Sequence, residues 1–292
     1  MAVARLLLMV LVCAVFHATI AYAALPAGSE PSAIVWKRLV TGLDLARVVL
    51  SFPSQDNGDA ALVGVFGPAG GKATATLLRI EPEHVVFTLH MASEKGFVPL
   101  ADVAVRDNLV AAINAGMFQQ DHITGTGYLK NASHTNNARV AANYGAFFVA
   151  EPYSKEMPRA RLIDRHEGDW QRTIAEYGIV MQNYRMNSLG GEVLWKRRDR
   201  LHSMSVLSQD IQGRVYFIFC PDMVQGTDFA AELLKLPLQL RTIMYLEGGS
   251  EAALLVRAGD VDRVETGRHL WGKGLGLSLP NILGVRLKKI NE

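Results

Sequence analysis

Two short segments of this sequence carry the residues best suited to chemistry, and both have the same pattern. The first, 109–118, is an apolar run that ends at Asn114 and is followed by Ala-Gly. The second, 242–256, is an apolar run that breaks at Glu247 and two glycines and then resumes. Glycine lets a ligand approach the backbone closely, and exposed N–H groups in such a turn can hold an anion. The pattern predicts two strand ends that place an amide and a carboxylate beside backbone donors.

Small residues complete the predicted binding surface. Gly116 leaves room beside the Asn114 side chain, which offers one acceptor and two donors. Gly248, Gly249 and Ser250 follow Glu247, and we expect them to bind the substrate. The alternative for this second segment is a tight hairpin whose glutamate points into solvent.

The order of these motifs resembles the phosphodiester glycosidase family. Asn-Ala-Gly-Met-Phe at 114–118 and Leu-Glu-Gly-Gly-Ser at 246–250 carry the resemblance. It extends through four further segments, 125–128, 144–148, 213–217 and 280–285, and so covers most of the chain after about residue 80. The combination of motifs is more specific than any one of them.

The resemblance implies a hydrolase that cleaves a sugar-1-phosphate diester in a phosphorylated glycan or polysaccharide of the envelope. Because the phosphate leaves as a stable anion, the reaction needs a carboxylate for the oxocarbenium-like centre or for water, and donors or cations for the phosphate. Glu247 is the predicted carboxylate, Asp121 the second acid, and His202 or Arg185 the phosphate-binding group. The common family pattern is Asp-Gly-Gly, and the extra methylene of Glu247 moves the carboxylate by roughly 1 Å, enough to change rate or substrate.

Three further candidates each have a structural alternative. Gln182 ends the apolar run 178–182 and could contact the substrate, or it could be an amide satisfied by the protein. His202 could replace a cation found in many family members, or it could be a buried structural histidine. Trp271, between glycines, could stack on a sugar or fill the core.

Two other classes of function remain open. A non-catalytic glycan-binding protein of the envelope would keep the pocket without the chemistry. A metal-dependent phosphodiesterase would use Asp121, His122, His134 and Glu247 as ligands, although these residues lack a recognised ligand spacing. We predict no specific cofactor and leave a divalent cation open. The sequence contains no P-loop, Cys-rich metal motif or Gly-x-Ser-x-Gly elbow.

The N-terminus predicts export. Residues 1–23 combine Arg5, an apolar core at 6–15 and a small-x-small ending at Ala23, as in a secretory signal peptide. The apolar run is shorter than the about 20 residues of a membrane span, and an uncleaved anchor is the alternative. We expect a periplasmic or secreted protein with a flexible tail at 24–33 and no membrane span after cleavage.

Charge and cysteine content narrow the class of protein. The chain has 30 basic and 28 acidic residues, and loss of Arg5 with the signal leaves 29 and 28, a net charge of +1, which does not predict nucleic-acid binding. Only Cys220 remains after cleavage, so no intramolecular disulfide can form. Stability must come from a packed core, for which the 49% of apolar residues suffice.

The hydrophobic patterns predict an α+β fold: a mixed, largely antiparallel sheet flanked by a few helices, in a single domain at 34–290. We expect Asn114 and Glu247 at neighbouring strand ends of this one sheet, lining a common pocket. Other strands are expected at 34–40, 43–52, 75–80, 84–90, 144–150, 178–182, 201–207, 213–219 and 282–287. Helices are expected at 98–108, 167–177 and 227–236, the last capped by Thr227.

Overall fold

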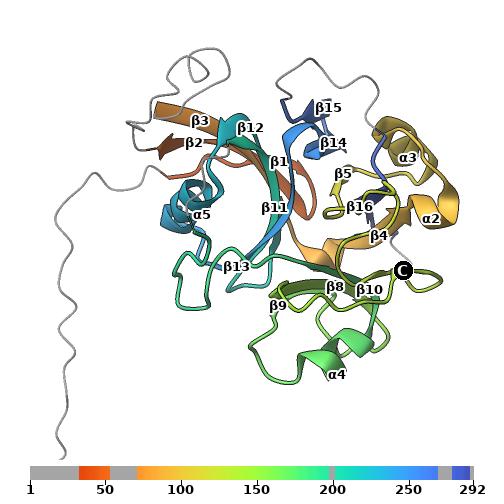
Figure 1. Cartoon of the computed structure of the whole chain (residues 1–292). Helices are drawn as coiled ribbons and strands as arrows, with labels where there is room; N and C mark the ends of the chain where they lie inside the picture. Colours follow the sequence, from red (N-terminus) through yellow and green to blue (C-terminus); the bar gives the residue numbers. More distant parts are fainter. Residues whose placement is uncertain (1–32, 53–70, 197–200, 269–277, 290–292) are drawn as a thin grey trace, which may run out of the picture. The chain divides into compact units, whose positions relative to one another are not determined.

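A computed structural model describes residues 33–52, 71–196, 201–268 and 278–289, all within the compact unit Ala33–Glu292. The predicted signal peptide, nearly all of the predicted tail and Trp271 lie outside the described residues. The fold is largely β, with three sheets and a few short helices (Figure 1). Among the described helices, none has the length and apolar character needed to cross a membrane.

The described strands form three separate sheets, which we call sheets I, II and III. In order across each sheet, sheet I contains β1 (Lys37–Val40), β2 (Leu43–Phe52), β3 (Gly71–Ile80), β12 (Val215–Val224), β11 (His202–Asp210) and β13 (Leu240–Gly248). Sheet II contains β7 (Thr135–Asn137), β6 (Leu129–Lys130), β10 (Tyr177–Asn183), β8 (Ala146–Pro152) and β9 (Ala160–Asp164). Sheet III contains β15 (Val261–Thr266), β14 (Ala253–Ala258), β5 (Ala111–Asn114), β16 (Asn281–Leu287) and β4 (Val85–Met91).

Every pairing between these strands is antiparallel. The predicted antiparallel character is therefore confirmed, whereas the single mixed sheet is wrong. The expected strands 75–80 and 84–90 also separate, because β3 pairs in sheet I and β4 in sheet III. A short 3-10 turn, η1 (Pro82–His84), carries the chain from one sheet to the other.

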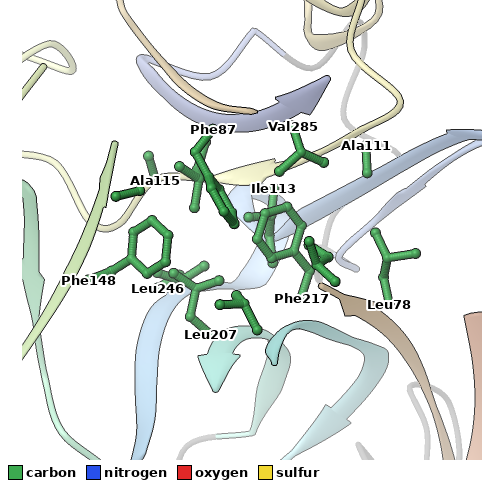
Figure 2. Close-up of a cluster of buried hydrophobic side chains, with 14 of the residues drawn as sticks. Leu78, Phe87, Ala111, Ile113, Ala115, Phe148, Leu207, Phe217, Leu246 and Val285 are labelled. Carbon is green, nitrogen blue, oxygen red and sulfur yellow. The ribbon is translucent and has the colours of Figure 1, made fainter. Parts of the chain in front are cut away.

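The inner faces of all three sheets share one core. Leu207 and Phe217 come from sheet I, Phe148 from sheet II, and Ile113 and Val285 from sheet III, and all five are buried in one cluster (Figure 2). Phe87 and Phe148 pack edge to face, with ring centroids 5.3 Å apart, across sheets II and III. Burial of this apolar surface is what holds the three sheets together.

The outer face of each sheet packs against a short helix. Helix α5 (Gly226–Lys235) places Phe229 and Leu233 on sheet I, helix α3 (Leu100–Arg106) covers sheet III, and helix α4 (Trp170–Ala175) covers sheet II. Because both faces are buried, successive strand residues such as Phe147 and Phe148 are both apolar. The helix α2 (Ala92–Lys95) follows β4 directly.

The N-terminal end of α5 differs from the prediction. The helix starts at Gly226, and its N-cap is Gln225 rather than Thr227, with no side-chain cap hydrogen bond. Helix α4 does have a side-chain N-cap, because the Asp169 side chain accepts from Arg172 N at 3.1 Å.

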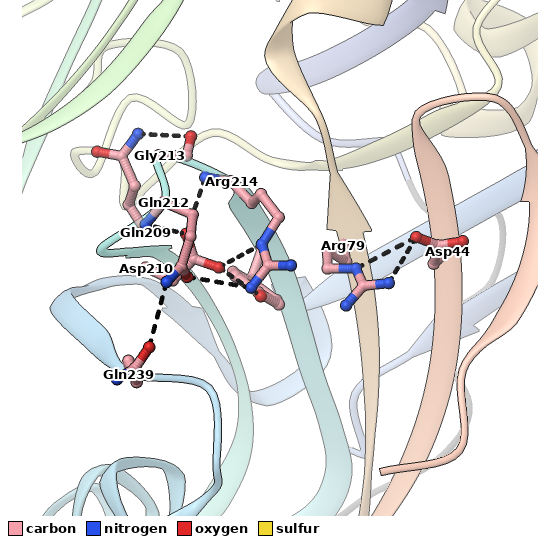
Figure 3. Close-up of polar contacts among 9 residues, drawn as sticks. Asp44, Arg79, Gln209, Asp210, Gln212, Gly213, Arg214 and Gln239 are labelled. Carbon is pink, nitrogen blue, oxygen red and sulfur yellow. Dashed lines mark hydrogen bonds and ion pairs between the residues drawn. The ribbon is translucent and has the colours of Figure 1, made fainter.

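A buried carboxylate organises the turn between β11 and β12. Asp210 accepts hydrogen bonds from Arg214 Nε at 2.6 Å and from Tyr216 Oη at 2.8 Å, while its other oxygen accepts the backbone N–H groups of the turn (Figure 3). These bonds satisfy a charge that would otherwise be costly to bury. They fix the C-terminal end of β11, whereas His202 lies at its N-terminal end.

The shared core predicts a clear difference between two apolar sheet residues. We expect Phe217→Ala to lower the free energy of unfolding by about 3–5 kcal/mol, because Phe217 is fully buried between the sheets. Val49→Ala is the control, since Val49 is 60% exposed and its loss is expected to cost within about 0.5 kcal/mol. Urea denaturation measures both, and equal losses would contradict the shared core.

Candidate active site

Asn114 and Glu247 lie in different sheets but are joined through one serine. Asn114 ends β5 of sheet III, and Glu247 lies near the end of β13 in sheet I. Ser205 Oγ lies 2.7 Å from Asn114 Oδ1 and 3.2 Å from the Glu247 carbonyl oxygen, and its single proton can be donated to either. The predicted shared sheet is therefore wrong. The contacts join the Asn114 side chain to the Glu247 backbone, and the expectation that both side chains line a common pocket stays a prediction.

Sheet II contributes to the same place through Asn183. The Asn183 side chain, at the end of β10, donates from Nδ2 to the Leu246 carbonyl oxygen at 3.1 Å. Gly116 lies beneath this amide: its φ is +91°, and a Cβ added there would sit 3.1 Å from Asn183 Nδ2. Gly116 is thus required both for its backbone conformation and for this close approach.

The ends of the strands are irregular here, which re-aims the side chains. The β11–β13 register shifts between Ser205 and Val206, opposite Leu246, and the β11–β12 register shifts between His202 and Met204. Such bulges bend a strand locally and change the direction of its side chains. Strand β13 then passes into η2 (Gly249–Glu251) and β14 of sheet III, so the predicted strand, turn and strand are present without forming a hairpin.

The Glu247 carboxyl has unusual electrostatics. Burial raises its pKa to about 7, the hydrogen bond from Gly248 N to Oε1 at 3.0 Å opposes this shift, and the nearby Glu251 charge adds to it. Burial also raises the pKa of Tyr144 and of Tyr245, and the Glu247 charge contributes to both shifts. The two tyrosines therefore lie within electrostatic range of the carboxylate.

His202 is brought to the same site. A Cβ added to Gly248 would lie 2.1 Å from His202 Cδ2 and 2.7 Å from Tyr245 Oη, so only glycine fits between them. The His202 and Tyr245 rings are 6.3 Å apart and nearly perpendicular, at 85°. Of the predicted phosphate-binding groups, His202 is the one that the structure places next to the Glu247–Gly248 backbone.

Asn114 is more deeply buried than a typical substrate contact. It is 2% exposed, and its Oδ1 also accepts from Ala253 N at 3.1 Å. Its Nδ2 is buried and has no hydrogen-bond acceptor among the described residues. The geometry thus gives Asn114 a role in holding the sheets in register at the site.

Gln182 has the structural role that was the alternative to substrate binding. Its Oε1 accepts from Tyr128 N and Ala141 N, and its Nε2 donates to the carbonyl oxygens of Ala141 and Tyr144, at 2.9–3.2 Å. All four hydrogen bonds that the amide can make are used. They hold the 128–144 segment against β10.

Arg185 and Asp121 are also engaged by protein groups. The Arg185 guanidinium pairs with the fully buried Asp164 of β9. Asp121 is exposed, and its carboxylate accepts from Ile123 N, Thr124 N and Thr124 Oγ1 within its own turn, which lowers its pKa. No contact that the structure describes joins either side chain to Glu247.

The remaining candidates are placed as follows. Gly249 has a φ of +71° and its carbonyl oxygen accepts from Ala252 N at 3.3 Å, while Ser250 is half-buried in η2.

Of the four residues suggested as metal ligands, His134 contacts Ser93 Oγ at 2.9 Å and Asp121 is held in its turn. Among the described residues, no three His, Cys, Asp or Glu side chains are grouped as a metal site would require.

Three residues of this site were not among the predicted site residues: Asn183, Ser205 and Tyr144. Asn183 and Ser205 are polar residues within apolar strands, at 1% and 0% exposure, and a buried polar side chain in a strand signals a specific partner. Tyr144 was expected in the strand 144–150, within a segment that carries the family resemblance, and it lies just before β8.

A cavity of about 520 Å³ lies away from Glu247, by the turn between β11 and β12. Its lining includes Arg159, Arg161, Asp210, Arg214 and Arg241. In the β11–β13 ladder Leu240 pairs with Asp210 and Glu247 with Ser205, so this cavity is at the opposite end of the two strands. It plays no part in the site described here.

The raised pKa of Glu247 predicts how stability depends on pH. The folded state holds the proton of the Glu247 carboxyl more tightly than the unfolded chain does. The contribution of this carboxyl to the free energy of unfolding is therefore full below the ordinary pKa of 4.5 and is lost as the pH rises through about 7. Glu247→Gln removes the charge, so we expect the variant to equal wild type at pH 4.5 and to be the more stable protein at pH 8. Chemical denaturation at both pH values measures this.

The control for this experiment is Glu156→Gln, because Glu156 is an exposed glutamate outside the site. Its substitution is expected to leave the pH dependence of unfolding as in wild type. A Glu247→Gln variant with the same pH dependence as wild type would mean that the carboxyl is not perturbed by burial.

Comparison with known proteins identifies the family. The model of the phosphodiester glycosidase family matches residues 107–286. The fold is similar to the catalytic domain of zebrafish N-acetylglucosamine-1-phosphodiester α-N-acetylglucosaminidase, auto-inhibited by its pro-peptide, at 10% identity and a TM-score of 0.57 over 84% of each chain. A Synechocystis protein described as hypothetical matches at 12% identity and a TM-score of 0.58, over 89% of this chain and 64% of that chain. No curated protein matches in sequence. Since the family model spans more than half of the 292 residues, the chain belongs to the phosphodiester glycosidase family.

Proposed function

We propose that the protein is an exported hydrolase that cleaves the C1–O bond of a sugar-1-phosphate diester in a phosphorylated glycan of the cell envelope. The observation that carries this proposal is the half-buried Glu247, whose pKa of about 7 matches the operating pH of a general base. Family membership and the printed name of the zebrafish protein favour an N-acetylglucosamine-1-phosphodiester as substrate.

In this proposal the ionised Glu247 carboxylate acts at the anomeric carbon. It either activates a water molecule or stabilises the oxocarbenium-like transition state, and the phosphate departs as an already stable anion. The surrounding burial strengthens the electrostatic interaction between the carboxylate and the developing positive charge. Ser205 and Asn114 fix the backbone that carries this carboxylate.

The phosphate is proposed to bind next to Gly248, at His202 and the backbone around Gly249. His202 is beside Gly248, whereas no contact that the structure describes places the Arg185 side chain, which pairs with the buried Asp164, at Glu247 or Gly248. Removing Arg185 from that pair would leave a buried charge without compensation. His202 is therefore the stronger candidate for the phosphate contact.

The charge of Glu247 can be removed without changing the size of its side chain. Glu247→Gln keeps the size of the side chain but removes its negative charge, so we expect at least a ~100-fold lower kcat on the methyl diester of N-acetylglucosamine 1-phosphate. In wild type, kcat/KM is expected to rise with pH through about 7 as the carboxyl ionises. Glu247→Asp is the companion variant, because it carries the residue common in the family with a shorter reach.

The matched control is Glu251→Gln, which removes the neighbouring charge and leaves the Glu247 carboxylate in place. It is expected to retain turnover and to shift the pH profile toward lower pH, since the Glu251 charge helps to raise the Glu247 pKa. Absence of hydrolysis by wild type across a panel of phosphoglycans, with and without Ca²⁺, Mg²⁺ or Zn²⁺, would favour a glycan-binding protein instead.

Two alanine variants distinguish the roles of two buried serines of β11. Ser205 bridges sheets I and III, whereas Ser208 Oγ donates to the Thr242 carbonyl oxygen at 2.9 Å within sheet I. Alanine at either position removes one hydrogen bond and is expected to cost about 0.5–1.5 kcal/mol of stability. Only Ser205→Ala is expected to lower kcat, by ~10-fold or more, because it alone loosens the backbone of Glu247. Equal kcat values for the two variants would refute the positioning role of Ser205.

A further inference from the structure

Four aromatic rings form a continuous patch next to Glu247, and we call them the aromatic corner: Tyr144, Tyr184, Trp195 and Tyr245. Tyr184 and Trp195 meet nearly at right angles, with ring centroids 6.0 Å apart at 86°. Tyr144 lies 4.4 Å from Tyr184, and Tyr245 lies 5.1 Å from Trp195. Tyr245 Oη lies 2.7 Å from the position that a Cβ on Gly248 would occupy, so the corner reaches the residue next to Glu247.

The segment 184–187, which begins with Tyr184, lies along the edge of β13. Tyr245 N donates to the Tyr184 carbonyl oxygen at 3.0 Å, and Met186 N donates to that of Ile243 at 2.9 Å. The Asn187 side chain accepts from Ile243 N at 2.7 Å and donates to the Arg241 carbonyl oxygen at 2.8 Å. Tyr184 is thus held in register with Tyr245, two residues before Glu247.

Both outer rings are fixed before any ligand arrives. Trp195 Nε1 donates to the Arg185 carbonyl oxygen at 3.1 Å, and the indole packs on Gly226, where an added Cβ would lie 2.7 Å from Cε3. Tyr184 Oη accepts from Asn143 Nδ2 at 3.1 Å. A rigid ring loses little conformational entropy on binding, which makes such a surface suited to recognition.

The exposure of the rings distinguishes a binding surface from a core. Tyr144 and Tyr245 are buried, at 6% and 7% exposure, whereas Tyr184 and Trp195 are only half-buried. The faces of aromatic rings carry negative potential, so the Tyr184 and Trp195 rings offer no favourable contact to a phosphate. The polarised C–H face of a pyranose carries partial positive charge and apolar area, and it suits the corner.

We propose that Tyr184 and Trp195 bind the pyranose ring of the substrate and place its anomeric carbon at Glu247. This assignment rests on the proposed function and adds the direction of the substrate: the sugar lies over the aromatic corner, and the phosphate lies at His202 and Gly248. It also names residues that determine specificity for a sugar with an unsubstituted C–H face.

The test measures binding without turnover, in a Glu247→Gln background. Calorimetry with N-acetylglucosamine is expected to give a Kd at least ~10-fold weaker for Trp195→Ala and for Tyr184→Ala than for the parent. Quenching of tryptophan fluorescence by the sugar is expected to be lost in Trp195→Phe, a milder change that keeps an aromatic ring. Inorganic phosphate is expected to bind parent and Trp195 variants equally.

The matched control is Trp170→Phe. Trp170 is a half-buried indole that stacks on Phe147, with centroids 5.1 Å apart, on the outer face of sheet II. It is expected to leave the sugar affinity and the quenching as in the parent. Unchanged sugar affinity in Trp195→Ala and Tyr184→Ala, or no sugar binding by the parent, overturns the proposal.

Failure of this inference is separable from failure of the proposed function. If wild type hydrolyses the methyl diester, Trp195→Ala is expected to raise KM at least ~10-fold with little change in kcat, because stacking binds ground state and transition state alike. If wild type hydrolyses nothing but the sugar binds through Trp195, the aromatic corner stands and the enzyme is refuted. A normal KM in Trp195→Ala refutes the corner and leaves the enzyme intact.

Discussion

The hydrogen bond from Ser205 to Asn114 connects two sheets that share no backbone pairing. A buried side chain that loses its partner costs about 1–3 kcal/mol, so this contact and that of Asn183 with the Leu246 carbonyl oxygen fix how the sheets meet. The apolar core between the sheets is not directional and would tolerate small shifts. The polar contacts do not tolerate them, and they are concentrated at the strand end that carries Glu247.

This arrangement also explains why Glu247 has an unusual charge state. The meeting of the sheets removes water from its carboxyl, and the one hydrogen bond described for that carboxyl, from Gly248 N, is too little to compensate for burial. A second donor such as arginine would lower the pKa of Glu247 toward its ordinary range. The ionised carboxyl therefore costs stability at neutral pH and above.

The sequence identified the two segments that form the site, because a polar residue and glycine after an apolar run are local features. Strand β2 and the β11–β12 pair were also predictable, since their patterns are local. The assignment of β5 and β13 to different sheets was not predictable, because antiparallel strands buried on both faces look alike wherever they pair. Gln182 and Arg185 were predicted as site residues because the sequence shows a polar residue at the end of a strand. It does not show the partners of that side chain, which come from distant segments.

Strand β13 is an edge strand of sheet I, and the segment that covers its edge also carries Tyr184. An exposed edge strand is liable to pair with other chains, and here the segment after β10 covers it through Tyr184, Met186 and Asn187. The same backbone hydrogen bonds that protect the edge also hold the Tyr184 ring beside Tyr245. The aromatic corner therefore needs no separate scaffold, since its geometry follows from the requirement that an edge strand be paired. Because that segment also runs directly from Asn183, any movement of sheet II relative to sheet I would displace the corner and the Glu247 backbone together.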